Sequence, residues 1–301
     1  MNAQIIDSSS WKWSVSGNIG VNRNEISDLG LLPADFGCLG ERVGYYGNSL
    51  GDHFGVGHIF LAGEAPGLFY GYVTQGIVQK EDITENGIKY IKQDGSVGYY
   101  QTVNKTTPVA GDVKYVDRNG DGVVDDNDRD IIGNPNPDFT YGFQTKVSWK
   151  SLSLSASFNG VQGRDILNVG NRYNNTPGTK SNNVTRKAFQ NMWTDENPSN
   201  LYPKSTFVVQ NMVMDRYVED GSYLRCSDIT LSYVLPAKWT NKIGIKNTSV
   251  YASVKNAFVI TDYSGYDPEV NSFAFDGLRP GVDMNSYPTP RSFVFGLNLT
   301  F

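Results

Sequence analysis

The twelve residues from 117 to 128, DRNGDGVVDDND, carry oxygen-bearing side chains at the spacing of a calcium-binding loop. In the EF-hand pattern, oxygen ligands occupy positions 1, 3, 5, 7, 9 and 12, and a glycine at position 6 permits the sharp turn. Gly122 stands at the turn, and Val124 is the apolar residue that anchors such a loop inward. The predicted ligands are Asp117, Asn119, Asp121, the carbonyl of Val123, Asp125 and Asp128.

The last ligand position departs from this pattern, because Asp128 replaces the bidentate Glu. Its side chain is shorter by one methylene, so we expect ligation through one oxygen and weaker binding. VAGDVKYV (109–116) indicates a strand before the loop, and PNPDF (135–139) breaks regular structure after it. Since no helix pair flanks the loop, we expect a structural calcium ion rather than a signalling one. The alternative is an acidic surface turn without metal.

Other residues that could do chemistry are few. His53 and His58 are the only histidines, and both stand in a glycine-rich stretch. Cys38 and Cys226 lie far apart without CxxC spacing, so we expect two idle thiols, with a disulfide as the alternative. No G-x-S-x-G elbow is present. We therefore predict no catalytic residues and no enzyme activity.

Length and composition indicate a folded chain. Its 301 residues suffice for one large domain or two ordinary ones, and 39% hydrophobic residues can bury a core. The net charge of −5 argues against nucleic acid as a partner, because that partner requires a basic face. Seven acidic and three basic residues lie between 112 and 130, so most of the negative charge is local, as at a cation site.

The elements that would position the loop alternate apolar and polar residues with a period of two, which is typical of strands with two different faces. In 139–150, Phe139, Tyr141 and Phe143 share a face that continues to Trp149. Lys150 and Ser151 then form a tight turn into the next alternating run. The six alternating runs are WKWSVSGNIGVNRN (11–24), FTYGFQTKVSWK (139–150), SLSLSASFNG (151–160), ITLSYVLP (229–236), TSVYASVKNAFVI (248–260) and SFVFGLNLTF (292–301).

The length and linkage of these runs favour a membrane barrel over a soluble sandwich. A spanning strand has about 9 to 11 residues, whereas strands of soluble folds have about five or six. The links at 150–151 and 236–247 are short, and those at 25–137, 163–221 and 261–290 are long. Outer-membrane barrels alternate short periplasmic turns with long extracellular loops in this way. No signal peptide or apolar helix opens the chain, which alone would suggest a soluble cytoplasmic protein.

Five segments, in this order, resemble those of one transporter family. The chain is similar to the C-terminal part of a SusC/RagA-type TonB-dependent outer-membrane transporter, from about Trp11 to Phe301. This resemblance implies an all-β fold, in which the chain supplies a six-strand portion of a 22-stranded antiparallel transmembrane β-barrel with long extracellular loops. The segments are GEAPGLFYGYVTQGI (63–77), GDVKYVDRNGDGVVDDNDRDIIGNPNPDFTYGF (111–143), YVEDGSYLRCSDITLSYVLP (217–236), NAFVITDYSGYDPEV (256–270) and YPTPRSFVFGLNLTF (287–301).

The same resemblance implies partners and a function. Such proteins import oligosaccharides or peptides with energy passed through TonB, and a SusD-like surface lipoprotein acts as their lid. No plug or TonB-contacting segment precedes Met1, so we expect a fragment that needs the rest of the barrel and the plug. The expected parts are a strand after a periplasmic turn (1–24), a large extracellular loop holding the calcium loop (25–137), a hairpin (138–163), a loop with a short helix (164–221), a hairpin (222–260), a loop (261–289) and the last strand (290–301).

Two further groups of residues receive expected roles. The last strand resembles the signal that the barrel-assembly machinery reads, and a plain lipid-facing strand is the alternative. Its residues are Phe293, Phe295, Leu297, Leu299 and Phe301. Loop aromatics could contact the glycan or peptide substrate or the lid, or only pack the loops. They are Tyr45, Tyr46, Tyr99, Tyr100, Trp193, Tyr202, Tyr263 and Tyr266.

One loop segment and two competing functions complete the predictions. Residues 183–193 are expected to form a short helix with Asn183 as its cap and one face made of Val184, Ala188, Phe189, Met192 and Trp193. A secreted, calcium-stabilised carbohydrate-binding module would explain the aspartates and tyrosines but not the apolar last strand. A calcium-dependent enzyme explains least.

Overall fold

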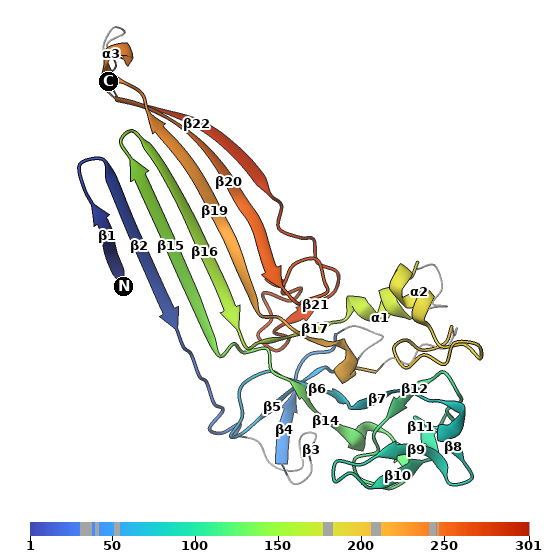
Figure 1. Cartoon of the computed structure of the whole chain (residues 1–301). Helices are drawn as coiled ribbons and strands as arrows, with labels where there is room; N and C mark the ends of the chain where they lie inside the picture. The colour runs from blue at the N-terminus through green and yellow to red at the C-terminus, as the bar shows by residue number, and fades with distance from the viewer. Residues whose placement is uncertain are drawn as a thin grey trace.

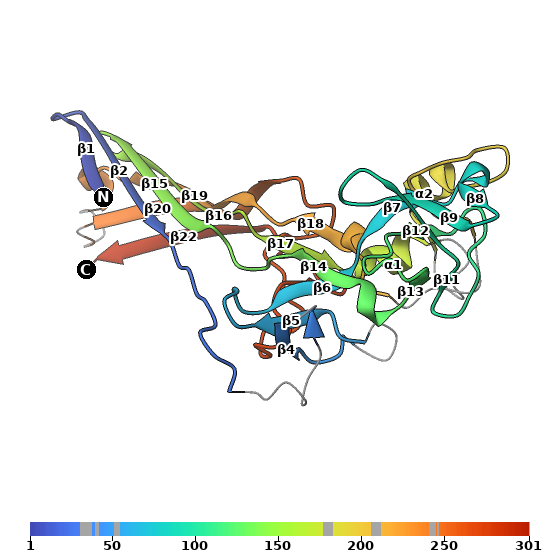
Figure 2. The same ribbon diagram turned by 90° about the horizontal axis from the view of Figure 1, so that it is seen from below.

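A computed structural model describes residues 1–30, 38–39, 42–50, 55–176, 183–205, 212–240, 245 and 247–300. The described chain is an all-β protein with two parts, a long antiparallel sheet and a packed region of short strands beyond one of its ends (Figure 1). Figure 2 shows the two parts from a second direction. Within the described residues, no helix combines the length and apolar content needed to cross a bilayer.

The long sheet is a meander in which every strand pairs with its neighbour in the strand order β1-β2-β15-β16-β19-β20-β22. All of its pairings are antiparallel. The strands are β1 (Asn2–Asp7), β2 (Trp11–Gly20), β15 (Phe139–Trp149), β16 (Leu152–Gln162), β19 (Tyr223–Val234), β20 (Asn247–Thr261) and β22 (Ser292–Thr300). The six predicted strands are present, and an antiparallel all-β fold is confirmed.

A seventh strand, β1, corrects the prediction of six. The sequence NAQIID places Ile5 and Ile6 side by side and therefore lacks a clean alternation. The pairing of β1 with β2 is also irregular between Gln4 and Ile6. A bulge of this kind breaks the period of two, which explains why the strand could not be recognised from its pattern.

The register of the sheet separates an apolar face from a polar one. Trp11 pairs with Trp149, and the ring centroids of these two tryptophans lie 5.9 Å apart. The same row continues through Leu152, Tyr233, Val250 and Leu297. On the opposite face, one row contains Gln4, Ser14, Lys146, Ser155, Thr230 and Ser253. Such a sheet presents apolar side chains to one environment and polar side chains to another.

An extra residue in β19 changes the phase of this alternation. Ser157 pairs with Asp228, but the next residue, Phe158, pairs with Cys226, so Ser227 has no partner of its own. On the C-terminal side of this bulge, the odd-numbered residues of β19 lie on the apolar face. On its N-terminal side, Cys226 and Leu224 lie on that face. Arg225 therefore lies on the polar side, which the uninterrupted alternation would not predict.

The second part gathers segments that are far apart in the sequence. Its strands are β3 (Cys38–Leu39), β4 (Arg42–Tyr46), β5 (His58–Leu61), β6 (Leu68–Tyr72), β7 (Thr74–Ile77), β8 (Ile83–Thr84), β9 (Gly87–Ile91), β10 (Val97–Tyr100), β11 (Thr102–Val103), β12 (Val113–Tyr115), β13 (Val123–Val124), β14 (Arg129–Gly133), β17 (Asp165–Asn168), β18 (Val218–Asp220) and β21 (Val282–Asp283). We call it the loop region. Its largest sheet has the order β14-β6-β5-β4-β3.

The main hydrophobic core lies in the loop region and is rich in tyrosine. Phe69, Tyr72, Tyr100 and Tyr115 are among its buried side chains. The loops are also joined by backbone contacts, since β17 pairs with both β18 and β21, and Tyr72 forms a bridge with Met214. The loop region is therefore one packed body, and not a set of independent loops.

Six short helices complete the described fold: η1 (Lys80–Asp82), η2 (Asp126–Asp128), η3 (Asp215–Tyr217), α1 (Gly170–Asn175), α2 (Arg186–Asn191) and α3 (Ala237–Thr240). The helix α2 falls within the predicted 183–193, but its cap is Thr185 and not Asn183, because Thr185 Oγ1 accepts from the Ala188 N–H at 3.2 Å. Ala188 and Trp193 are buried, whereas Phe189 is exposed. The predicted single apolar face is thus only partly correct.

Candidate transport wall, calcium loop and outer loops

The predicted calcium loop is closed by aspartates at its two ends, both of them buried. Asp117 accepts hydrogen bonds from the backbone N–H groups of Gly120 (2.6 Å) and Gly122 (2.9 Å). Asp128 accepts from Arg118 (2.7 Å), Asn119 (3.2 Å) and Asp125 (2.8 Å). Burial raises the pKa of Asp128, although these N–H groups oppose the shift. Backbone hydrogen bonds thus hold the loop in its turn.

The other predicted ligands face neighbouring N–H groups as well. Asp121 accepts from Val123 at 2.8 Å and from Asn119 Nδ2 at 3.0 Å, and Asp125 accepts from Asn127 at 2.8 Å. In the described part of the chain, no three His, Cys, Asp or Glu residues converge as metal ligands would. This geometry shows a tight turn stabilised by aspartates without a converged ligand set, and the calcium ion stays a prediction.

The polar face of the long sheet carries an ionic cluster around Asp228. This carboxylate accepts from Thr230 Oγ1 (2.8 Å) and Ser253 Oγ (2.6 Å), and it lies 2.7 Å from the Lys255 ammonium. Charged and hydroxyl side chains are therefore concentrated on this face. They suit contact with water or polar partners.

A second ionic cluster joins the sheet to the loop region. The Arg225 guanidinium, on β19, contacts Asp267 at 2.5 Å, and its Nε lies 3.0 Å from a Glu269 carboxylate oxygen. Burial disfavours the charge of Asp267, but backbone N–H groups of Glu269 and Thr289, with Arg225, lower its pKa overall. Sequence reasoning missed this pair. A charged residue inside the apolar strand sequence YLRCSDITLSYV was the available signal.

The loop aromatics divide into buried and accessible ones. Tyr100, Trp193 and Tyr263 are at most 8% exposed and pack the loop region, which agrees with the alternative that these aromatics only pack the loops. Tyr266 is 70% exposed and Tyr99 is 39% exposed. Both remain open to a ligand. Tyr45, Tyr46 and Tyr202 are half-buried.

The remaining predicted residues have different outcomes. His58 is fully buried, its Nε2 lies 2.9 Å from the Pro280 carbonyl oxygen and its ring packs edge-on against Phe69, which is a structural role. Cys226 is a buried free thiol. His53 and Phe301 lie outside the described residues. The other residues of the predicted assembly signal, Phe293, Phe295, Leu297 and Leu299, are exposed on the edge strand β22, and their recognition stays a prediction.

Comparisons with known proteins show which sequences and folds this chain resembles. No protein-family model matches the chain. The chain is 29% identical over 310 residues to the TonB-dependent receptor P26 of Formosa agariphila and 30% identical over 310 residues to the TonB-dependent receptor SusC of Bacteroides thetaiotaomicron. Its fold matches the closed-closed RagAB peptide importer with a TM-score of 0.66 at 25% identity, and a second RagAB structure with 0.67 at 23%.

Over its whole length the chain is similar to one part of the SusC/RagA-type TonB-dependent transporters. All of the chain aligns with P26 and SusC, but it spans only 28% and 26% of their respective lengths. It likewise covers 28% of the RagAB chain. These relatives are receptors and transporters and not enzymes, which agrees with the expectation that the chain carries no catalytic site.

Proposed function

We propose that the chain forms the C-terminal part of the wall and outer loops of an outer-membrane importer. The sheet carries the main argument, because six of its seven strands have 9 to 15 residues and present one apolar and one polar face. Strands of at least nine residues can cross a bilayer, and lipid requires an apolar outer face. The alternative, a soluble carbohydrate-binding module, does not explain the row of exposed aromatic and aliphatic side chains, because no lipid would cover them.

The polar face would line the aqueous interior and contact the plug. Lys146, Asp228 and Lys255 supply charge there, while serines and threonines supply hydrogen-bonding groups. Two edges, β1 and β22, end the sheet, and lipid cannot satisfy unpaired strand edges. The remaining strands of the barrel would pair with these edges. The number of 22 strands is carried over from the family resemblance.

The loop region would form the outer vestibule through which a nutrient enters. Oligosaccharides and peptides are the proposed cargoes, with a SusD-like lipoprotein as the lid and TonB as the source of energy. RagAB, a peptide importer, supports this class of cargo by similarity. A calcium ion at 117–128 would stabilise the vestibule and take no part in catalysis, since extracellular calcium can saturate even a weak site.

The growth of a deletion strain tests the proposed import function. A strain that lacks the protein should lose growth on one class of oligosaccharide or peptide but keep growth on the corresponding monomer. Restored growth should require both the protein and an intact TonB system. Unchanged growth of the deletion strain on every oligomer tested would refute import as the function.

A further inference from the structure

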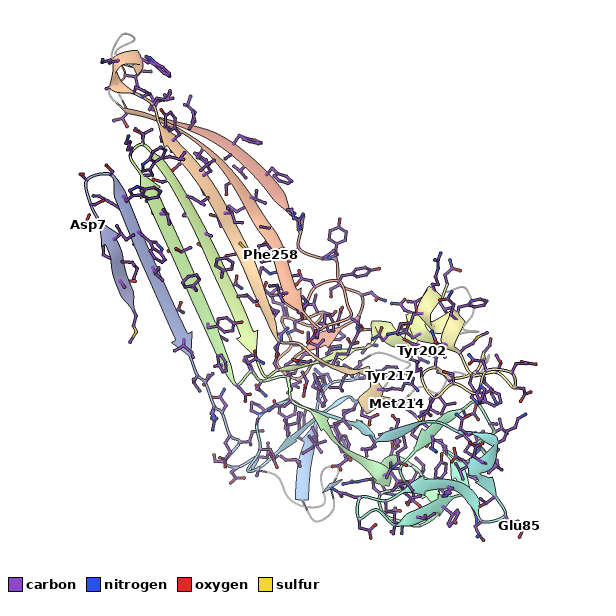
Figure 3. The ribbon with its side chains drawn as sticks, viewed as in Figure 1. Asp7, Glu85, Tyr202, Met214, Tyr217 and Phe258 are labelled. Carbon is purple, nitrogen blue, oxygen red and sulfur yellow. The ribbon has the colours of Figure 1, made fainter. Side chains whose placement is uncertain are left out.

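A recess of about 480 Å³ opens in the loop region between α1, the start of α2 and η3. Its volume falls in the range of small-molecule sites, about 300 to 1,000 Å³. Leu201, Tyr202 and Tyr217 form the apolar part of its wall, and Figure 3 shows the two tyrosines near each other in this part of the molecule. Tyr217 is buried, while Tyr202 is half-buried and can offer part of its ring to a ligand.

Among the described residues of this wall Glu219 is the one with a carboxylate, and this group holds the wall together. Its oxygens accept from Asn168 Nδ2 at 2.9 Å and from the backbone N–H and Oγ of Ser264 at 2.8 and 2.9 Å. Asn171 Nδ2 donates to the same carboxylate. Asn175 in turn donates to Asn171 Oδ1 at 3.0 Å. These hydrogen bonds fix the wall before a ligand arrives, and they use most of the acceptor capacity of Glu219.

Two cationic side chains border the recess, and neither pairs with a carboxylate among the residues that the structure describes. Arg216 donates one N–H to the Leu201 carbonyl oxygen at 2.6 Å, and a guanidinium has five N–H donors in all. Lys187 is exposed at the rim. The ion pairs found among the described residues include neither of them. The described lining of the recess therefore contains two cationic side chains and one carboxylate, and the oxygens of this carboxylate already accept hydrogen bonds from the wall.

We propose that this recess binds an anionic sugar unit, one carrying a carboxylate or a sulfate, within an oligosaccharide cargo. The inference rests on the proposed import function. An aromatic ring packs against the apolar face of a sugar, and a guanidinium and an ammonium bind an acidic group by charge-assisted hydrogen bonds. A peptide brings main-chain groups that also need hydrogen-bonding partners, whereas the lining offers the aromatic ring of Tyr202 beside the cationic groups of Lys187 and Arg216.

Binding to the intact, detergent-purified protein tests the inference. Calorimetric titration would use trigalacturonate, a sulfated galactose trisaccharide, neutral galactotriose and an acidic tripeptide. We expect at least one acidic trisaccharide to bind at least tenfold more tightly than the neutral one, with affinity that falls as salt is added. The two acidic sugars distinguish carboxylate from sulfate as the recognised group.

Variants show whether the recess is responsible. Lys187→Gln and Arg216→Gln should each weaken acidic-sugar binding at least threefold, and by more than they weaken neutral-sugar binding, whereas Arg216→Lys should retain most of the acidic-sugar binding. The matched control is Lys89→Gln, an exposed lysine on β9, which should change nothing. Because Arg216 also holds Leu201, the exposed Lys187 provides the variant that does not endanger folding.

Three results would overturn the inference: equal affinity for acidic and neutral sugars, tighter binding of the acidic peptide, or unchanged binding in Lys187→Gln and Arg216→Gln. These results differ from failure of the import function. If the deletion strain cannot grow on neutral oligosaccharides, yet the purified protein shows no preference for acid, only the acidic-sugar inference fails. If the deletion strain grows normally on every oligomer, import itself fails.

Discussion

Arg225 and Asp267 form an ion pair that ties the long sheet to the loop region across 41 intervening residues. Their side chains are 6% and 5% exposed, whereas those of the Lys12–Asp7 pair are 66% and 68% exposed. Removing one partner of a buried pair leaves an uncompensated charge, which typically costs about 3 to 5 kcal/mol. An exposed pair contributes about 0 to 1 kcal/mol.

We therefore predict that Asp267→Ala loosens the attachment of the loop region far more than Asp7→Ala does. Hydrogen exchange of the detergent-purified protein should increase in 261–289 and in the upper part of β19 for the first variant only. Equal protection of these segments in both variants would show that the ion pair does not hold the two parts together.

Acid should destabilise the loop region through His58. Burial, with a smaller effect of the Arg279 charge, lowers the pKa of His58 from 6.5 to about 4, while the Pro280 carbonyl and Asp276 oppose the shift. The unfolded chain therefore binds this proton at a higher pH than the folded one. The stabilisation is complete above pH 6.5 and is lost as pH falls toward 4, at up to about 1.4 kcal/mol per pH unit.

Thermal melts of wild type and His58→Gln between pH 7 and 4 measure this effect. Glutamine can still donate to the Pro280 carbonyl but does not titrate. We expect the melting temperature of the wild type to fall more steeply than that of the variant below pH 6.5. Parallel curves would exclude His58 as the source.

Calcium should stabilise the loop region if the 117–128 loop binds it. An ion at one hundred times its Kd contributes about 2.7 kcal/mol by mass action. The melting temperature of the intact protein should therefore rise with calcium and fall with a chelator, and Asp121→Ala should reduce this difference. Asp94→Ala removes an acid from a neighbouring turn and serves as the control. An identical melting temperature with and without chelator would refute the calcium site.

Deleting Phe301 tests the role of the last strand. If its terminal aromatic helps the assembly machinery to recognise the protein, the amount inserted into the outer membrane should fall. Import per inserted molecule should stay nearly constant. Phe275→Ala, at an exposed loop aromatic, should change the inserted amount little. Normal insertion without Phe301 would contradict the role.

The alternation of residues in 139–160 was enough to predict a hairpin, because each strand has a different environment on its two faces. The same pattern could not reveal β1, whose adjacent isoleucines accompany an irregular register. Nor could it place Arg225, since the phase change at Ser227 is visible only in the pairing with the neighbouring strands β16 and β20. Regular periodicity is a local property of the chain, while register and bulges depend on the neighbouring strand.

The loop region was harder to anticipate for a different reason. A tyrosine that packs in the core and a tyrosine that binds a ligand look the same in the sequence. Tyr100 and Tyr266 differ only in their surroundings in the folded structure, where the first is buried and the second is exposed. The spacing of the aspartates predicted a turn, and Gly122 adopts the expected left-handed conformation with φ of 85°. Ligand convergence requires side-chain orientation, which spacing alone does not fix.

Because of the bulge at Ser227, the faces of β19 depend on the number of residues in the strand as well as on their types. Deleting this one residue would keep every other side chain, yet it would exchange the inner and outer faces of the strand on one side of the deletion. Either Arg225 would turn toward the apolar side or Leu231 and Tyr233 would turn toward the polar one. Such strands can therefore diverge by substitution more readily than by insertion or deletion, and length changes are accommodated more easily in the loops between them.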